Sequence, residues 1–115
     1  MKDSVAMGLL YDYYGDLLTE KQRACFDLYY NQDYSLAEIA AEAGISRQGV
    51  HDAIARAETL LRNFEEKIGA VARDARIQRA VGAIETAAAA LSGWDDAGVR
   101  ALAAEIRRAA ASIKE

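Results

Sequence analysis

The chain has 115 residues, no proline and one cysteine, and its 14 Lys and Arg are outnumbered by 18 Asp and Glu, which gives a formal net charge of −4. The 25 Ala against five Val and three Thr leave too few β-branched residues for an all-β fold. An all-α fold is expected, because Ala, Leu, Glu, Lys and Arg lose little on entering a helix. The acidic balance disfavours tight non-specific binding of nucleic acid, which depends on Lys and Arg neutralising phosphates.

Neither a signal peptide nor a membrane-spanning segment is expected. The N-terminus carries an acid, Asp3, and lacks an uninterrupted apolar stretch of signal-peptide length. No apolar run approaches the roughly 18 residues of a membrane-spanning helix. The single Cys25 cannot form an internal disulfide. These features predict a soluble, cytoplasmic protein with no membrane partner.

Two helices are expected before residue 32. The first spans about residues 4–18, where apolar residues recur at steps of three and four and so form one helix face. That face consists of Leu9, Leu10, Tyr13, Tyr14, Leu17 and Leu18. Thr19 is followed three residues later by Gln22, and this capping pattern marks the start of a second helix over about residues 20–31. Its expected buried residues are Cys25, Phe26 and Tyr29.

A short helix and a long helix are expected next. Ser35, with Glu three residues on, repeats the capping pattern and opens a helix over about residues 36–43. Gly44 ends it, since glycine readily takes the positive φ found after a helix C-terminus. Ser46 then caps a helix over about residues 47–71. The apolar set of that helix is Val50, Ile54, Leu60, Leu61, Phe64, Ile68 and Val71.

The composition changes after residue 70, since 16 of the last 46 residues are Ala. Two apolar stripes follow, separated by Ser92-Gly93, and Asp95 or Asp96 can cap the second helix. The stripes are Ile77, Val81, Ile84, Ala88 and Leu91, then Val99, Leu102, Ile106, Ala109 and Ile113. We expect an Ala-rich helical hairpin. Because such stripes bury little, it is expected to pack on the first part of the chain or on a second copy, as a homodimer.

Residues 34–57 have the pattern of a helix-turn-helix. Ala40 is small where the two helices cross, and Gly44 permits the sharp turn between them. The outward face of the second helix carries Ser46, Arg47, Gln48, His51, Asp52 and Ala55. In this motif the N-terminal part of the second helix contacts bases and phosphates, so that Arg47 can pair with guanine or a phosphate and Gln48 with adenine. The sequence therefore predicts a helix-turn-helix module over residues 1–70 and a C-terminal extension over residues 71–115.

An alternative is that the motif is only a packing unit. Asp52 places an acid on the face that would meet phosphates, and Ala55 stands where a basic residue would help. Additional basic residues lie outside the motif's turn, at Arg56, Arg73, Arg76 and Arg79. The last three repeat at every third position, which is compatible with an RNA-backbone contact or with an ordinary solvated helix face.

Several segments resemble the YlxM (UPF0122-like) family of small bacterial proteins, whose helix-turn-helix is similar to that of sigma-factor region 4. They are residues 13–22 (YYGDLLTEKQ), 28–30 (LYY), 33–36 (DYSL) and 45–48 (ISRQ), followed by Asp52. The resemblance covers about residues 7–68. It implies an accessory or regulatory role in the signal recognition particle pathway, with the particle's RNA or GTPase as partner; family members are also described as DNA-binding. Gly49, His51 and Ala55 depart from the family's Ala, aromatic and basic residues, and the segment after residue 70 matches no family signature.

Catalysis, a metal site and a cofactor are not expected. His51 is the only histidine, Cys25 is expected on a buried face of another helix, and no glycine-rich phosphate loop is present. The leading hypothesis is a non-enzymatic, nucleic-acid-binding accessory or regulatory protein of the signal recognition particle pathway. Its expected binding residues are Ser46, Arg47, Gln48, His51, Arg56, Arg73, Arg76 and Arg79. The alternatives are a sequence-specific DNA-binding regulator and an adaptor that binds the particle's GTPase without nucleic acid.

Overall fold

The computed structural model describes residues 3–114, and this part of the chain contains helices and no strand, which confirms the all-α fold. The elements are α1 (Ser4–Tyr14), the 3₁₀-helix η1 (Gly15–Leu17), α2 (Glu20–Phe26), the π-helix η2 (Asp27–Asn31), α3 (Leu36–Ala43), α4 (Arg47–Ile68), α5 (Ala70–Leu91) and α6 (Ala97–Ile113). They form two compact units, with the boundary between Val71 and Ala72. The part before this boundary is called the first unit, and the part after it the hairpin.

Predicted capping residues begin two helices of the first unit, α2 and α3. Thr19 Oγ1 accepts from the Gln22 amide at 3.2 Å, and the Gln22 side chain accepts from the Thr19 amide at 3.0 Å. Ser35 and Glu38 form the same reciprocal pair at 3.1 and 2.9 Å. The two bonds to the Glu38 carboxylate hold the pKa of that group below its usual value. These local bonds confirm that short-range sequence patterns position α2 and α3.

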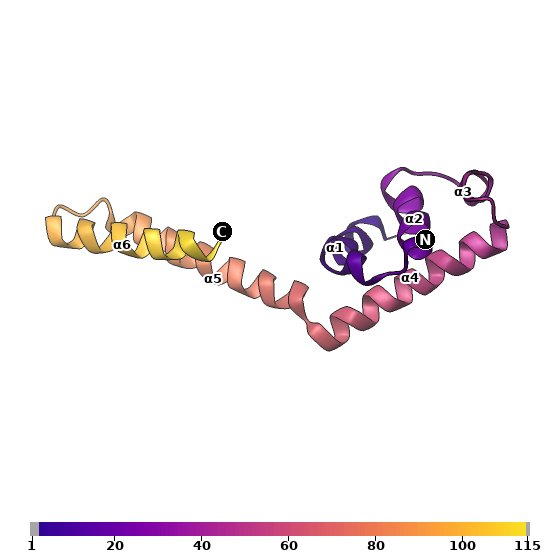
Figure 1. The fold of residues 1–115 in the computed structure, drawn as a ribbon. Coiled ribbons are helices and arrows are strands. Elements are labelled where there is room, and N and C mark those ends of the chain that lie inside the picture. Colours follow the sequence, from indigo (N-terminus) through magenta and orange to yellow (C-terminus); the bar gives the residue numbers. More distant parts are fainter. Residues whose placement is uncertain (1–2, 115) are drawn as a thin grey trace. The chain divides into compact units, whose positions relative to one another are not determined.

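Helices α1, α2 and α3 all pack on α4, which is the longest helix of the first unit (Figure 1). One core cluster joins α1, α2 and α4, and its buried residues are Met7, Tyr14, Leu18, Phe26, Ala57 and Leu61. A second cluster joins α2, α3 and α4 through Cys25, Ile39, Val50, Ala53 and Ile54. Burial raises the pKa of the Cys25 thiol, as expected for a cysteine that acts as a small apolar residue.

The buried face of α1 differs from the predicted one. Met7 and Tyr14 are buried, whereas Leu9 and Tyr13 are exposed. The helix ends at Tyr14 rather than near residue 18, because η1 follows and turns the chain so that Leu18 is buried and Leu17 is 58% exposed. The prediction extended one helix across this turn and therefore chose a stripe rotated from the true one.

A π-helix, which the sequence pattern did not indicate, continues α2. The predicted helix over residues 20–31 is α-helical only to Phe26, and η2 supplies the remainder. One wider turn rotates the residues that follow it relative to the α-helical register. Tyr29 is half-buried and packs against the core cluster that contains Cys25, so it is less buried than predicted.

Gly69 separates α4 from α5, so the predicted extension of α4 to Val71 is wrong. Gly69 has φ +67°, a conformation that favours glycine and ends the helix. The first amides of α5 are satisfied by side chains of the first unit: Ala70 donates to Tyr14 Oη and Val71 to Glu65 Oε1, both at 3.1 Å. Tyr14 Oη donates in turn to Glu65 Oε1. This network fixes the break between the two helices.

The hairpin is built from α5 and α6, with Asp96 capping α6 by accepting from Gly98 and Val99 at 2.8 and 3.1 Å. An ion pair of 2.8 Å between Lys114 Nζ and Glu85 Oε1 joins its two helices. The buried residues repeat at steps of seven and are Val81, Ala88, Ala103 and Ala110. The predicted stripe of α6 is wrong, because the large residues Leu102, Ile106 and Ile113 are exposed. Small alanines face the interior because they permit the close approach of two helices.

No helix within residues 3–114 is both long and apolar enough to cross a lipid bilayer.

Candidate nucleic-acid interface

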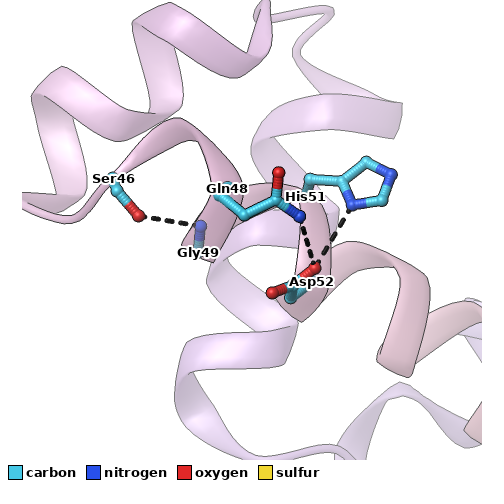
Figure 2. A network of polar contacts seen from close by, with 5 residues as sticks. All are labelled: Ser46, Gln48, Gly49, His51 and Asp52. Atoms are coloured by element: carbon cyan, nitrogen blue, oxygen red, sulfur yellow. Dashed lines mark hydrogen bonds and ion pairs between the residues drawn. The ribbon is translucent and has the colours of Figure 1, made fainter.

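The turn between α3 and α4 has the geometry of a helix-turn-helix. Gly44 takes φ +70°, and the Ala40 carbonyl accepts from the Gly44 and Ile45 amides at 3.0 and 3.3 Å. Ser46 Oγ accepts from the Gly49 amide at 2.9 Å and so begins α4 (Figure 2). Gly44 in the left-handed conformation ends α3, and the Ser46 cap begins α4, so the chain changes direction within three residues. Both features were predicted from the sequence.

The two faces of α4 separate cleanly into buried apolar and exposed polar residues. The buried side consists of Val50, Ala53, Ile54, Ala57 and Leu61. The exposed residues of the first half of the helix are Arg47, Gln48, His51, Asp52, Ala55 and Arg56, with Ser46 exposed before them. The predicted binding residues of this helix therefore all lie at the surface. Such a helix can present its N-terminal turns to a groove or to another surface.

Asp52 engages two of the predicted binding residues. Gln48 Nε2 donates to Asp52 Oδ1 at 2.9 Å, and His51 Nδ1 lies 3.3 Å from the same oxygen (Figure 2). The bond from Gln48, and next that from His51, lower the pKa of the Asp52 carboxyl, which favours its charged form. All three side chains are exposed, and exposed contacts of this kind contribute little stability. A ligand can therefore displace them, and Gln48 keeps a second amide hydrogen and its carbonyl oxygen for a base even while it donates to Asp52.

Arg47 differs from Gln48 and His51, because it forms no ion pair or hydrogen bond within residues 3–114. It is the first residue of α4 and is exposed. An arginine there retains all its donors for phosphate or guanine. Arg47 accordingly has no hydrogen bond or ion pair within residues 3–114 to lose on binding.

A basic residue that the sequence analysis missed lies on the other flank of α4. Lys21 of α2 and Arg56 of α4 line one shallow hollow, together with Thr19, Gln22, Gly49, Asp52 and Ala53. Packing of α2 on α4 brings these two cations to the same side of the exposed face. Two cations beside a helix-turn-helix can contact a phosphate backbone. The sequence did not indicate Lys21, because it belongs to a different helix and its neighbours in the chain do not form a basic cluster.

Arg73, Arg76 and Arg79 belong to α5 within the hairpin and are exposed. They form a basic stretch of their own and are not among the residues of the α4 face described above. Residues three apart are neighbours on a helix surface, so these side chains follow one another along α5 and spread over about a third of its circumference. Their participation in binding stays a prediction.

Within residues 3–114, no group of three or more His, Cys, Asp or Glu is arranged to hold a metal ion.

Comparison with known proteins identifies the family. Residues 1–92 match the family model UPF0122, described as helix-turn-helix proteins like YlxM and p13. The chain is 56% identical over 75 residues to a UPF0122 protein of Thermoanaerobacter sp. (strain X514), covering 65% of this chain and 64% of that protein. It is 45% identical over 87 residues to one of Symbiobacterium thermophilum, covering 76% and 81%. The matched part thus spans less than two thirds of the Thermoanaerobacter protein. With the helix-turn-helix in place and a family match over four fifths of its length, the chain belongs to the UPF0122 family of helix-turn-helix proteins.

Proposed function

We propose that this protein is a non-enzymatic regulatory or accessory protein that binds nucleic acid through the exposed face of α4. The observation that carries the proposal is the first turn of α4, where Arg47 and Gln48 are exposed directly after the Ser46 cap. Free amide groups near a helix start favour an anion, and Arg47 adds a full positive charge beside them. Arg56 and Lys21 supply further cations on the flank.

The geometry favours duplex DNA as the ligand of α4. The major groove of B-form DNA admits an α-helix, whereas the major groove of A-form RNA is too deep and narrow for side chains to reach its bases. Gln48 can contact adenine, and Asp52 can accept from the amino group of cytosine. Sequence-specific binding of this kind requires a homodimer whose two α4 helices lie about 34 Å apart, one helical turn of DNA.

The RNA of the signal recognition particle is the second candidate ligand. The resemblance to the YlxM family supports it, because that family is associated with the particle's pathway. The spacing of Arg73, Arg76 and Arg79 on α5 also suits contacts with an RNA backbone, which depend on charge more than on base edges. In this version α4 contributes Arg47 and Arg56 as phosphate contacts, and His51 as an exposed hydrogen-bonding side chain.

The test compares the affinity of the full chain for labelled duplex DNA and for the particle's RNA at moderate salt, by fluorescence anisotropy. We expect Arg47→Ala to weaken binding to the true ligand about tenfold, within the 1–3 kcal/mol typical of one arginine contact. Arg108→Ala, which removes an exposed arginine from α6, is the charge-matched control and is expected to leave the affinity within about twofold. Equal losses in both variants would mean that α4 has no specific part in binding.

The same experiment separates the remaining alternatives. Binding of DNA alone supports a transcriptional regulator, and binding of the particle's RNA alone supports an accessory role in that pathway. If neither nucleic acid binds, the result favours the remaining hypothesis, an adaptor that binds the particle's GTPase. The acidic first unit, with 7 Lys and Arg against 12 Asp and Glu up to Val71, is the feature that favours this adaptor role.

A further inference from the structure

A second candidate site lies in the first unit, beside the exposed face of α4. It is a hollow of about 340 Å³ between η2, the first residue of α3 and the middle of α4. Its lining consists of Tyr29, Tyr30, Leu36, His51, Ile54, Ala55 and Glu58. Neither Arg47 nor Gln48 lines it; both line an adjoining hollow that shares Leu36 and His51 with this one. Of the predicted binding residues, only His51 lines the hollow beside η2.

Aromatic packing holds the walls of this hollow in place. The ring of Tyr30 stacks on Phe26 at 4.4 Å between centroids, and Phe26 stacks on Tyr11 at 4.7 Å. Tyr29 meets Tyr30 edge to face, with the ring planes at 88°. Because Phe26 is fully buried, the stack is attached to the core of the first unit. Two consecutive tyrosines of the π-helix η2, Tyr29 and Tyr30, both line the hollow.

Glu58 places a carboxylate beside these rings, and one of its two oxygens accepts no hydrogen bond in the described part of the chain. It is half-buried, and its Oε2 accepts from the Tyr30 hydroxyl. Burial and this bond raise the pKa of Tyr30, so the tyrosine remains a donor at neutral pH. Glu58 Oε1 has no hydrogen-bond partner within residues 3–114. No Lys or Arg lines the hollow, and Arg62, one turn further along α4, forms no ion pair with Glu58 in the described chain.

We infer that this hollow binds an arginine side chain from a basic segment of a partner protein. A guanidinium group lies well against aromatic rings and forms strong, charge-assisted bonds with a carboxylate. Tyr29 and Tyr30 provide the rings, and Glu58 Oε1 provides the acceptor. The first unit as a whole carries 12 acidic against 7 basic residues, so its net charge favours the approach of a basic segment.

A protein segment suits the hollow better than a nucleotide. An unpaired base stacked on Tyr29 would carry its phosphates close to the Glu58 carboxylate, which lines the same hollow. Glu58 forms no ion pair with Lys or Arg within residues 3–114 to offset that repulsion. An arginine is instead attracted by this carboxylate.

The test uses the full-length protein and a short acetylated, amidated peptide of alternating Gly and Arg, with the citrulline version as the uncharged, isosteric control. Binding is followed by NMR chemical-shift changes at the amides of Tyr29, Tyr30 and Glu58. We expect the arginine peptide to bind at least tenfold more tightly than the citrulline peptide, because only the former supplies the charge.

Two variants and one control locate the site. Glu58→Gln keeps an acceptor for Tyr30 but removes the charge, and Tyr29→Leu keeps an apolar wall but removes the ring. Each is expected to weaken the arginine peptide at least fivefold while the thermal unfolding midpoint stays nearly unchanged. Glu66→Gln removes an equal charge from an exposed position of α4 and is expected to change the affinity by less than about twofold.

Several results would overturn the inference. They are undetectable binding of the arginine peptide at millimolar concentration, equal affinity for the citrulline peptide, equal weakening by Glu58→Gln and Glu66→Gln, or shift changes confined to other residues. A single-stranded adenine-rich RNA octamer is titrated in parallel. If that RNA shifts the same amides and binds more tightly to the Glu58→Gln variant, the hollow is a nucleotide site. None of these outcomes depends on whether Arg47 contacts nucleic acid.

Discussion

The first unit and the hairpin are both helical, but different interactions hold them together. The first unit buries Phe26, Ile39, Val50 and Leu61 completely or almost so, and these residues come from three different helices. The hairpin buries one valine, Val81, and otherwise only alanines. Burial of large apolar side chains is the main source of folding free energy. Two regions of similar helix content therefore differ in what stabilises them. The first unit has a core of large apolar side chains, whereas the hairpin depends mainly on helix propensity and capping.

The probes needed to follow the two regions separately are already present in the chain. All six tyrosines lie between residues 11 and 34, in the first unit, and the single tryptophan, Trp94, lies in the turn of the hairpin. Near-ultraviolet circular dichroism of tyrosine therefore reports the first unit, and tryptophan fluorescence reports the hairpin. Each prediction below uses this division.

The largest expected effect is that of Phe26→Ala. The substitution removes a fully buried ring between Tyr11 and Tyr30 and should lower the free energy of unfolding of the first unit by about 3–5 kcal/mol. Urea unfolding followed by the tyrosine signal measures it. Val81→Ala in the hairpin is the comparison and should cost only about 1–2 kcal/mol, seen by Trp94 fluorescence, because it removes two methyl-sized groups. If both probes move together in each variant, the two regions unfold as one and the distinction fails.

Removing one helix cap from each region should have a moderate effect. Ser35→Ala and Asp96→Ala each delete a side-chain acceptor at a helix start and should cost about 1 kcal/mol. The same loss of free energy should lower the thermal unfolding midpoint of the hairpin more than that of the first unit, because the hairpin buries fewer large apolar side chains. Thermal unfolding with the two probes tests this. Equal midpoint shifts would show that the hairpin has stabilising contacts comparable with those of the first unit.

The smallest expected effect is a loss of stability at alkaline pH that is confined to the first unit. The pKa values of Tyr11, Tyr14 and Tyr30 are all raised, chiefly by burial. The folded state therefore holds these protons more tightly than the unfolded state, so their contribution is fully present below about pH 10 and is lost as the pH rises above it. Urea unfolding at pH 8 and pH 10.5 should show the loss in the tyrosine signal. Tyr30→Phe should reduce this pH dependence, and an unchanged slope would contradict the assignment.

The helix-turn-helix illustrates how much of the site was predictable. Ser35, Gly44 and Ser46 act on amides or carbonyls within a few residues, and each was identified from the sequence in its correct role. The exposed face of α4 followed from the same helical periodicity. Lys21 was missed, and the bond from Gln48 to Asp52 was not foreseen, because each depends on side-chain positions that local patterns do not specify.

The wrong predictions about α1, α4 and α6 have one cause. The buried faces of α1 and α6 and the C-terminal limit of α4 were chosen by apolar spacing alone, which does not distinguish a contact with the core from one with solvent. The π-turn at η2 has no comparable spacing signature. The amino-acid sequence by itself determined the helical class, the caps and the sharp turn before α4, because these depend on interactions between near neighbours. Only the tertiary structure decided which stripes are buried and which charged groups converge, because packing between distant helices selects one face among several of similar hydrophobicity.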